Sequence, residues 1–233
     1  MLPDRRLEER QRPVSDLAES GVVVIGLGRF GISLAEELVD RGVDVLGIDN
    51  DPRIVQQLTG SLTQVMAADC TDADTLRQLG VQEFSHAVVA IGTDLEASIL
   101  AASLLVDLGV QDVWAKAINR EHGKILDRLG VHHVVLPEHD MGERVAHLVT
   151  GRMLDFIEFE DNFAMVKTSA PAFAVDKRLG ETRIRSEYGV TVVCIKRSGE
   201  DFTYATQDTV IRSGDTLIVA GTTTATESFA NLT

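Results

Sequence analysis

The chain is poor in cysteine and in basic residues. Its 233 residues include two cysteines, Cys70 and Cys194, which lie far apart and show no metal-ligand spacing. A disulfide framework and a zinc site are therefore both disfavoured. Lysine and arginine total 22 against 36 acidic residues, which gives a formal net charge of −14. Because nucleic-acid binding depends on neutralising phosphates with lysine and arginine, we expect no nucleic-acid partner.

Segments that could enter a membrane are also lacking. An uncharged apolar stretch such as Ala97–Val106 is about half of the roughly 20 residues that a spanning helix needs, so no direct membrane insertion is expected. Residues 1–20 are charged where a secretory signal needs an apolar core, and we expect a mobile tail there. These features together predict a cytoplasmic protein. Cys194, inside the apolar run Val190–Ile195, is expected to be fully buried.

Residues 21–150 contain short apolar runs that alternate with segments of helical periodicity. Strands are predicted at Val22–Ile25, Val43–Ile48, Gln64–Ala67, Ala87–Ile91, Asp112–Ala115 and His133–Leu136. Helices are predicted at Phe30–Arg41, Pro52–Leu58, Asp72–Leu79, Asp94–Leu108 and Arg120–Leu129. This alternation implies right-handed crossovers and a parallel sheet covered on both faces. The predicted fold class is α/β, with a Rossmann-like, doubly wound parallel sheet.

The alternation stops near Glu138. One more helix is predicted over Met141–Met153, and residues 151–233 predict a second, smaller α+β lobe at the C-terminus. Strands are expected there at Phe163–Thr168, Thr191–Lys196 and Thr216–Ala220, with a short helix over Leu179–Tyr188. A module of about 70 residues is near the lower size limit for independent folding. We therefore expect it to be stabilised by pairing with a second copy of the chain.

A glycine-rich turn follows the first predicted strand. Gly26, Gly28 and Gly31 fit the pattern G-x-G-x-x-G, and Asp49 stands 18 residues later, at the end of the second strand. Gly26 is expected to permit the tight turn, Gly28 the approach of a phosphate, and Gly31 the packing of helix on strand. Free N–H groups at the helix start favour a phosphate. A ribose hydroxyl pair can donate hydrogen bonds to Asp49. A carboxylate there would repel a 2′-phosphate, so NADP is disfavoured. The turn, with its strand, helix and acid, predicts a nucleotide site.

Other polar residues follow the remaining predicted strands, at the edge where open α/β sheets bind ligands. They are Asp69, Cys70, Gly92, Thr93, Asp94, Lys116 and Glu138. Thr71, Thr93 and Asn119 are equally suited to cap the helices that follow. Arg29, inside the glycine turn, can bind a phosphate or simply extend into solvent, and the residues alone leave this open.

An enzymatic site is harder to find. All six histidines precede residue 148, so the C-terminal lobe supplies none, and it shows no Ser-His, Cys-His or paired-carboxylate arrangement. Lys116 and Tyr188 are conceivable bases, but nothing links them to a substrate pocket. The sequence favours a nucleotide sensor that is not an enzyme. A small NAD-dependent oxidoreductase and a free-standing sensor without a transporter remain alternatives.

Several segments resemble those of RCK (regulator of potassium conductance) proteins of the KtrA and TrkA type. They are Val23–Gly31, Ile48–Asp49, Ala90–Gly92, Trp114–Ala117, Pro137–Gly142, Ile184–Val190 and Ile211–Leu217. The last two resemble the small C-terminal lobe of that family. The resemblance covers about residues 21–221, and the Gly-Leu-Gly-Arg-Phe-Gly form of the turn together with Pro-Glu-His-Asp-Met-Gly makes it specific.

The resemblance implies that the ligand is ATP or ADP, with NAD or NADH as the alternative. By this carry-over Arg29 meets the phosphates, and Asp49, Asn50 and Asp51 surround the ribose. The adenosine would be bordered by Asp69, Cys70, Ile91, Gly92 and Thr93, with Lys116 and His122 on the phosphate side. Glu138 would bind a divalent cation, Mg²⁺ or Ca²⁺, close to the phosphates.

The resemblance also implies partners. Family members form homodimers that assemble into a homo-octameric ring, in which the helix after Glu138 crosses between subunits. The ring would gate a KtrB- or TrkH-like potassium-translocating membrane subunit, to which this chain would be peripheral at the inner face of the membrane. Lobes of this kind can bind cyclic di-AMP, and Ile184, Arg185 and Tyr188 fall in that region. A dimerisation lobe without a ligand is the alternative.

Overall fold

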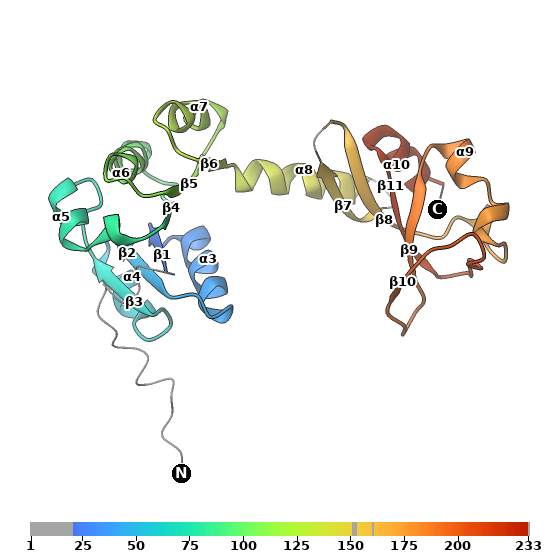
Figure 1. Ribbon diagram of the computed structural model, residues 1–233, viewed down its shortest axis with the longest axis horizontal. Coiled ribbons are helices and arrows are strands. Elements are labelled where there is room, and N and C mark those ends of the chain that lie inside the picture. Colours follow the sequence, from blue (N-terminus) through green and yellow to red (C-terminus); the bar gives the residue numbers. More distant parts are fainter. Residues whose placement is uncertain (1–20, 151–152, 160, 233) are drawn as a thin grey trace, which may run out of the picture. The chain divides into compact units, whose positions relative to one another are not determined.

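The computed structural model describes residues 21–150, 153–159 and 161–232, which form two compact units that divide between His139 and Asp140 (Figure 1). The tail expected for residues 1–20 lies outside the described residues. Within the described part of the chain, no helix combines the length and the apolar character needed to cross a membrane.

A six-stranded parallel sheet forms the centre of the first unit. Its strands are β1 (Val22–Ile25), β2 (Val45–Asp49), β3 (Gln64–Ala67), β4 (His86–Val89), β5 (Asp112–Lys116) and β6 (His133–Val135). They lie in the order β3-β2-β1-β4-β5-β6, and every neighbouring pair is parallel. The strand order reverses between β1 and β4, which is the point where doubly wound sheets bind ligands.

Helices cover both faces of this sheet. They are α3 (Arg29–Asp40), α4 (Pro52–Leu58), α5 (Ala73–Gln78), α6 (Leu95–Asp107) and α7 (Arg120–Arg128), with a short 3₁₀ turn η2 (Val81–Glu83). Successive residues of β1 belong to different cores: Val23 packs with residues of α5, α6 and α7, while Val24 packs with residues of α3 and α4. The predicted doubly wound α/β fold is confirmed, with element ends within about two residues of those expected.

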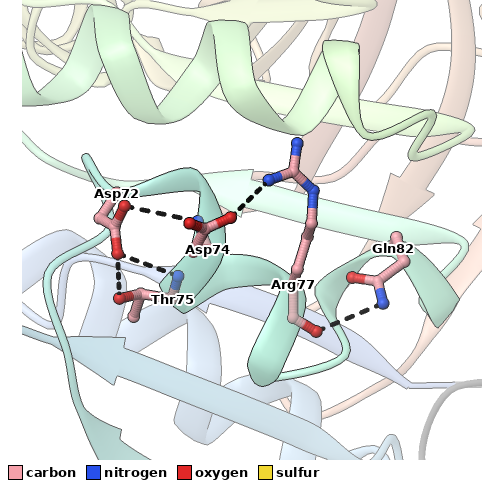
Figure 2. Close-up of polar contacts among 5 residues, drawn as sticks. All are labelled: Asp72, Asp74, Thr75, Arg77 and Gln82. Carbon is pink, nitrogen blue, oxygen red and sulfur yellow. Dashed lines mark hydrogen bonds and ion pairs between the residues drawn. The ribbon is translucent and has the colours of Figure 1, made fainter.

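Aspartate or asparagine side chains cap the N-termini of four of these helices. Figure 2 shows the start of α5, where Asp72 accepts hydrogen bonds from the Thr75 backbone N–H at 3.1 Å and from the Thr75 hydroxyl at 2.6 Å. Asp94 caps α6 and Asn119 caps α7 in the same way. The cap predicted at Asn119 is confirmed, whereas those at Thr71 and Thr93 are wrong, because in each case the aspartate one residue later supplies the acceptor.

The helix α8 (Pro137–Thr150) follows β6 and contains the division between the two units. The helix predicted at Met141–Met153 therefore begins too late and ends too late. Proline suits the first position of a helix, since its fixed φ is helical and it lacks an N–H that would be unpaired there. At the other end, Met153 already belongs to the next strand.

An antiparallel sheet of five strands forms the second unit. Its strands are β7 (Met153–Phe159), β8 (Phe163–Ser169), β9 (Thr191–Lys196), β10 (Phe202–Tyr204) and β11 (Thr216–Thr222), in the order β10-β9-β11-β8-β7. The remaining elements are η3 (Ala172–Ala174), η4 (Leu179–Glu181), α9 (Ile184–Tyr188) and α10 (Thr223–Ala230). Side chains from β8, β9 and β11 pack with α9 and α10 in one core, so the predicted α+β lobe is confirmed.

Several details of this unit differ from the sequence prediction. The expected helix over Leu179–Tyr188 is two short elements, because Arg183 between them adopts a left-handed backbone conformation with φ of 54°. The elements β7, β10 and α10 were not predicted. Cys194 is half-buried and not fully buried, because β9 turns Val192 and Ile195 into the core instead.

Candidate functional site

A cleft of about 850 Å³ lies at the carboxyl ends of the parallel strands. It is lined by residues that follow β1 to β4, by Lys116 at the end of β5, and by Glu138 in the first turn of α8. Most of the predicted site residues meet here: Gly26, Gly28, Arg29, Asp49, Asn50, Asp51, Asp69, Cys70, Ile91, Gly92, Thr93, Lys116 and Glu138. The structure therefore brings together thirteen of the fifteen residues predicted from the sequence.

Two glycines of the turn are required by the protein itself. Gly26 has a φ of +89°, and a Cβ on it would lie 2.8 Å from Cγ1 of Ile91. A Cβ on Gly31 would lie 1.9 Å from the carbonyl oxygen of Gly26, so only glycine lets α3 pack this closely on the turn. Gly31 thus supports the cleft from behind and does not line it.

The third glycine has no such constraint. A Cβ on Gly28 would meet no described atom within 4 Å, and its φ of −73° is accessible to any residue. Gly28 lines the cleft. The space above its Cα is therefore open to a group that approaches the backbone from the cleft.

The start of α3 faces the same cleft and has no side-chain cap. Gly28 occupies the capping position, and the first turn contains Arg29 but no acidic residue. By contrast, Asp51, Asp72, Asp94 and Asn119 cap α4 to α7 with side-chain oxygens. A positive side chain at a positive helix end is unfavourable by itself, and an anion in the cleft would satisfy both the free N–H groups and Arg29.

Asp49 braces the glycine turn against the end of β2. One carboxylate oxygen accepts a hydrogen bond from the Leu27 backbone N–H at 2.7 Å, and the other accepts from the Asp51 backbone N–H at 2.8 Å. The carboxylate is half-buried and lines the cleft. Since each carboxylate oxygen has two lone pairs, Asp49 can accept further hydrogen bonds from a ligand.

The neighbouring acids are held by local hydrogen bonds. Asp51 caps α4 and pairs with Arg53, whose Nη2 lies 2.8 Å from Oδ2, and these contacts hold the pKa of Asp51 below its ordinary value. Asp69 accepts from the hydroxyl of Thr71 at 2.7 Å and from its N–H, which likewise lowers the pKa of Asp69. Both are therefore ionised at neutral pH, and the cleft rim on this side is negative.

Cys70 lies in the wall of the cleft but is a poor nucleophile. Burial, together with the nearby charges of Asp69 and Asp49, raises the pKa of its thiol to about 12. The side chain also packs in the core between the sheet and α5. Cys70 is thus a neutral, apolar contact in this site.

A buried lysine and an exposed glutamate form an ion pair in the lining of the cleft. Lys116 Nζ lies 2.5 Å from Glu138 Oε1, and the two side chains are 10% and 68% exposed. The ammonium group also lies 5.6 Å from the centre of the Phe30 ring, where a cation–π contact is favourable. Lys116 and its hydrogen bond hold the pKa of Glu138 below its ordinary value.

The structure places His122 outside the lining of the cleft. Its Nδ1 accepts a hydrogen bond from the Ile118 N–H at 3.3 Å, and burial lowers the pKa of the ring. The ring is therefore neutral with its proton on Nε2, and that atom is buried with no hydrogen-bond partner among the described residues. In this structure His122 is a packed residue of α7.

Some lining residues were missed by the sequence reasoning. They are Phe30, Ser33, Ile54, Ala68, Thr71 and Ala97. Most belong to the first or second turn of the helix that follows a predicted strand. Helical periodicity applied to those first two turns would have found several of them, because residues three and four apart share a face.

The second unit contains a pocket of about 800 Å³ beside α9. Arg183, Ile184 and Arg185 line it. Tyr188 does not: its ring stacks on Phe173 at 5.2 Å and meets the edge of Phe229 at 5.7 Å. Of the three residues that the sequence suggested here, Ile184 and Arg185 lie at the pocket and Tyr188 belongs to the core.

Two family models match the chain. The TrkA-N domain model matches residues 22–137 and the TrkA-C domain model matches residues 164–233. The chain is 37% identical to Ktr system potassium uptake protein C of Bacillus subtilis (strain 168) over 207 residues, covering 88% of this chain and 94% of that protein. It is 35% identical to Ktr system potassium uptake protein A of Vibrio alginolyticus over 199 residues, covering 85% and 90%.

A solved structure with the same fold is the crystal structure of the GsuK RCK domain. It superposes with a TM-score of 0.66 at 20% identity, covering 97% of this chain and 51% of the solved chain. At this identity the match shows the fold, and the present chain corresponds to about half of that solved chain.

Proposed function

Because the chain belongs to the RCK family of Ktr and TrkA potassium uptake proteins, we propose that it is a nucleotide-binding regulatory subunit. It controls a separate, KtrB- or TrkH-like membrane protein that translocates potassium, and it works in the cytoplasm, attached to the inner face of the membrane through that partner. The names of the relatives, which are potassium uptake proteins, support this role.

One observation carries the nucleotide part of the proposal. The uncapped start of α3, with Arg29 in its first turn and the unobstructed backbone of Gly28, opens into the cleft at the switch point of the sheet. Backbone N–H groups, a helix dipole and an arginine directed at one place favour a phosphate chain. An apolar ligand would leave all of them unpaired.

The proposed ligand is ATP or ADP, with NAD or NADH as the alternative. Asp49, with Asn50 and Asp51 beside it, is suited to ribose hydroxyls, and the wall from Asp69 to Cys70 and from Ile91 to Thr93 would border the adenosine. A related structure, the GsuK channel, has been solved with NAD bound, which keeps the dinucleotide as the alternative. We propose Arg29 and Lys116 as the cationic contacts of the phosphates, since His122 lies outside the cleft lining.

A divalent cation fits beside Glu138. No group of three or more His, Cys, Asp or Glu side chains suited to a metal occurs within the described residues, so this chain would supply at most two such ligands, Glu138 among them. Mg²⁺ commonly binds one or two carboxylates and takes its other ligands from phosphate oxygens and water. Such an ion, or Ca²⁺, would neutralise part of the phosphate charge in an otherwise acidic cleft.

We expect the nucleotide to act as a signal and not to be consumed. The cleft thiol has a pKa of about 12, and the carboxylates at the rim, Asp51 and Asp69, are engaged by local donors. Nucleotide hydrolysis assayed alongside binding would test this, since turnover comparable with that of an ATPase would contradict a purely regulatory role.

The proposed assembly is a homodimer that forms an octameric ring, with a nucleotide-binding domain over residues 21–150 and a C-terminal lobe over residues 151–233. The helix α8 supports a crossing between subunits, because Met141, Val145 and Val149 are 53%, 45% and 77% exposed and repeat at helical spacing. Light scattering of the purified chain would test this. A monomer at micromolar concentration would contradict it.

Cyclic di-AMP is the proposed ligand of the C-terminal lobe. The pocket beside α9 offers Arg183 and Arg185 to a phosphate and Ile184 to a base. Calorimetry on the full chain would test it, and binding that survives Arg185→Ala unchanged would contradict this placement.

The phosphate role of Arg29 gives the sharpest test of the main site. We expect Arg29→Ala to lower the affinity for ATP about tenfold and the affinity for ADP by less, since a charge-assisted hydrogen bond contributes roughly 1.5–3 kcal/mol. Arg41→Ala is the matched control, because Arg41 lies at the opposite end of α3 and pairs with Glu37 on the surface. Equal losses for ATP and ADP, measured by calorimetry, would contradict the role. Mass spectrometry of the denatured protein would identify any nucleotide retained during purification.

A further inference from the structure

The Lys116–Glu138 ion pair links the cleft to α8. Lys116 is the last residue of β5, and Glu138 is the second residue of α8, the helix that continues beyond the first unit. Both side chains line the cleft. They are bonded to one another at the place where the phosphates and the cation of the proposed ligand would have to bind.

The two partners are unequally buried. Lys116 is 10% exposed and Glu138 is 68% exposed in their side chains. A buried ammonium that has lost its hydration needs an anion beside it. An exposed carboxylate remains hydrated and can leave the pair at small cost. Lys116 thus requires some anion, whereas Glu138 does not require Lys116.

The surroundings of Lys116 favour the arrival of a second anion. Within the described part of the chain, Glu138 provides its one hydrogen-bonding partner, although an ammonium group has three donors. The end of the Lys116 side chain packs closely against Gly92, where a Cβ would lie 3.2 Å from Nζ, so glycine is what lets the ammonium lie there. Because Lys116 lines the cleft, a phosphate oxygen that enters it can accept a hydrogen bond from one of the remaining donors.

The charge balance makes Glu138 a competitor of the phosphate. Five carboxylates line the cleft, from Asp49, Asp51, Asp69, Asp94 and Glu138, against two cationic side chains, Arg29 and Lys116. While Lys116 is bonded to Glu138, only Arg29 is free to attract the phosphates. A phosphate that approaches Lys116 is also repelled by Glu138.

We infer that the ligand binds by an exchange of partners: Lys116 transfers from Glu138 to a phosphate oxygen, and Glu138 transfers to the divalent cation. This inference rests on the proposed nucleotide function and adds its regulation. The cation converts Glu138 from a competitor into a ligand, so nucleotide and cation bind cooperatively. Before the ligand binds, Glu138 bonds the start of α8 to Lys116 of β5. After binding, Glu138 bonds it to the cation–nucleotide complex.

The test is ATP binding by the full chain, measured by calorimetry in EDTA and in Mg²⁺. In EDTA we expect Glu138→Gln to bind ATP more tightly than the unaltered chain, by roughly three- to tenfold, because one competing charge is removed. In Mg²⁺ we expect the order to be reversed, since only the carboxylate binds the cation. Glu83→Gln, which removes an exposed charge of η2 outside the cleft lining, is the control and should change neither affinity.

A second variant removes the other partner. Lys116→Met keeps an unbranched side chain one atom shorter and leaves Glu138 in solvent, so folding should persist, which a circular dichroism melt would check. We expect ATP affinity to fall about tenfold or more in both buffers. An unchanged affinity would overturn the exchange.

The outcomes separate the two proposals. If ATP binds the unaltered chain but Glu138→Gln binds it equally or less tightly in EDTA, the exchange is wrong and the nucleotide function stands. If neither ATP nor ADP nor NAD(H) binds the unaltered chain in either buffer, the proposed function fails and the exchange fails with it.

Discussion

The two units contain cavities of similar size that are built in opposite ways. The cleft of the first unit, about 850 Å³, gathers residues from position 25 to position 138, whereas the pocket of the second, about 800 Å³, gathers residues from 179 to 207. A parallel sheet brings the ends of consecutive strands to one edge, so distant segments converge there. In the antiparallel unit the pocket is formed by neighbouring stretches of chain around α9.

This difference has a consequence for stability. The cleft depends on close backbone approach at Gly26 and Gly31, and the second unit depends on a core shared by α9, α10 and its sheet. If the two units are energetically separate, a defect in one should leave the other intact.

The largest expected effect comes from the second core. Phe229 is fully buried and contacts the ring of Tyr188, so we expect Phe229→Ala to destabilise this unit by about 3–5 kcal/mol. The single tryptophan, Trp114, lies on β5 of the first unit. Its fluorescence should report an unchanged unfolding midpoint while far-ultraviolet circular dichroism shows an earlier transition.

Phe202→Ala serves as the control for that experiment, because Phe202 is 41% exposed and its loss should matter little. A parallel shift of the tryptophan signal in Phe229→Ala would show that the two units unfold together. It would contradict the idea that their stabilities are separate.

The next prediction concerns stability and compares Gly31 with Gly28, two glycines of the same turn. We expect Gly31→Ala to cost about 3 kcal/mol or more, because its Cβ would overlap the Gly26 carbonyl oxygen. Gly28→Ala should leave the unfolding free energy within about 0.5 kcal/mol but weaken nucleotide binding, since the added methyl group fills the open side of the cleft. Denaturant unfolding and calorimetry on both variants would measure this, and a stable Gly31→Ala protein would refute the packing argument.

The smallest expected effect concerns the start of α5, which a side chain caps, in contrast to the uncapped start of α3. Hydrogen bonds from Thr75 hold the pKa of Asp72 below its ordinary value of 3.8, so the ionised carboxylate stabilises the folded state above about that pH. This contribution disappears as the pH falls through the lower folded-state pKa. Asp72→Ala should lower the melting temperature slightly at pH 7, and the difference should narrow towards pH 3. Asp74→Ala tests whether the surface pair with Arg77 accounts for the effect instead.

Much of the first unit could be predicted from sequence because its signals are local. Continuous apolar strands such as Val22–Ile25, glycine after each helix and an acid at the end of β2 are all signals that act over a few residues. Thirteen of the fifteen predicted site residues line the cleft; strand ends and the glycine turn indicated most of them, and the family resemblance added Asn50, Asp51 and Ile91. His122 was placed near the phosphates by resemblance alone, and the structure instead buries it on α7.

The second unit was harder to predict because its patterns are mixed. In β7, exposed Leu154, Ile157 and Phe159 alternate imperfectly with acids and buried residues, so period-two alternation is obscured. The left-handed Arg183, which splits the expected helix, carries no sequence signal, since arginine rarely adopts this conformation. Tyr188 was expected at a ligand site, but its ring has two aromatic neighbours in the core.

Asp49 connects two properties that engineers usually treat as separate. In the proposed function its carboxylate distinguishes a free ribose from a phosphorylated one, and the same two oxygens accept hydrogen bonds from the N–H groups of Leu27 and Asp51. Replacing it to change which dinucleotide fits would also release the turn that shapes the phosphate end of the site. Altered ligand preference at this position would therefore be accompanied by a looser loop, and a redesign would need a new acceptor for both backbone groups.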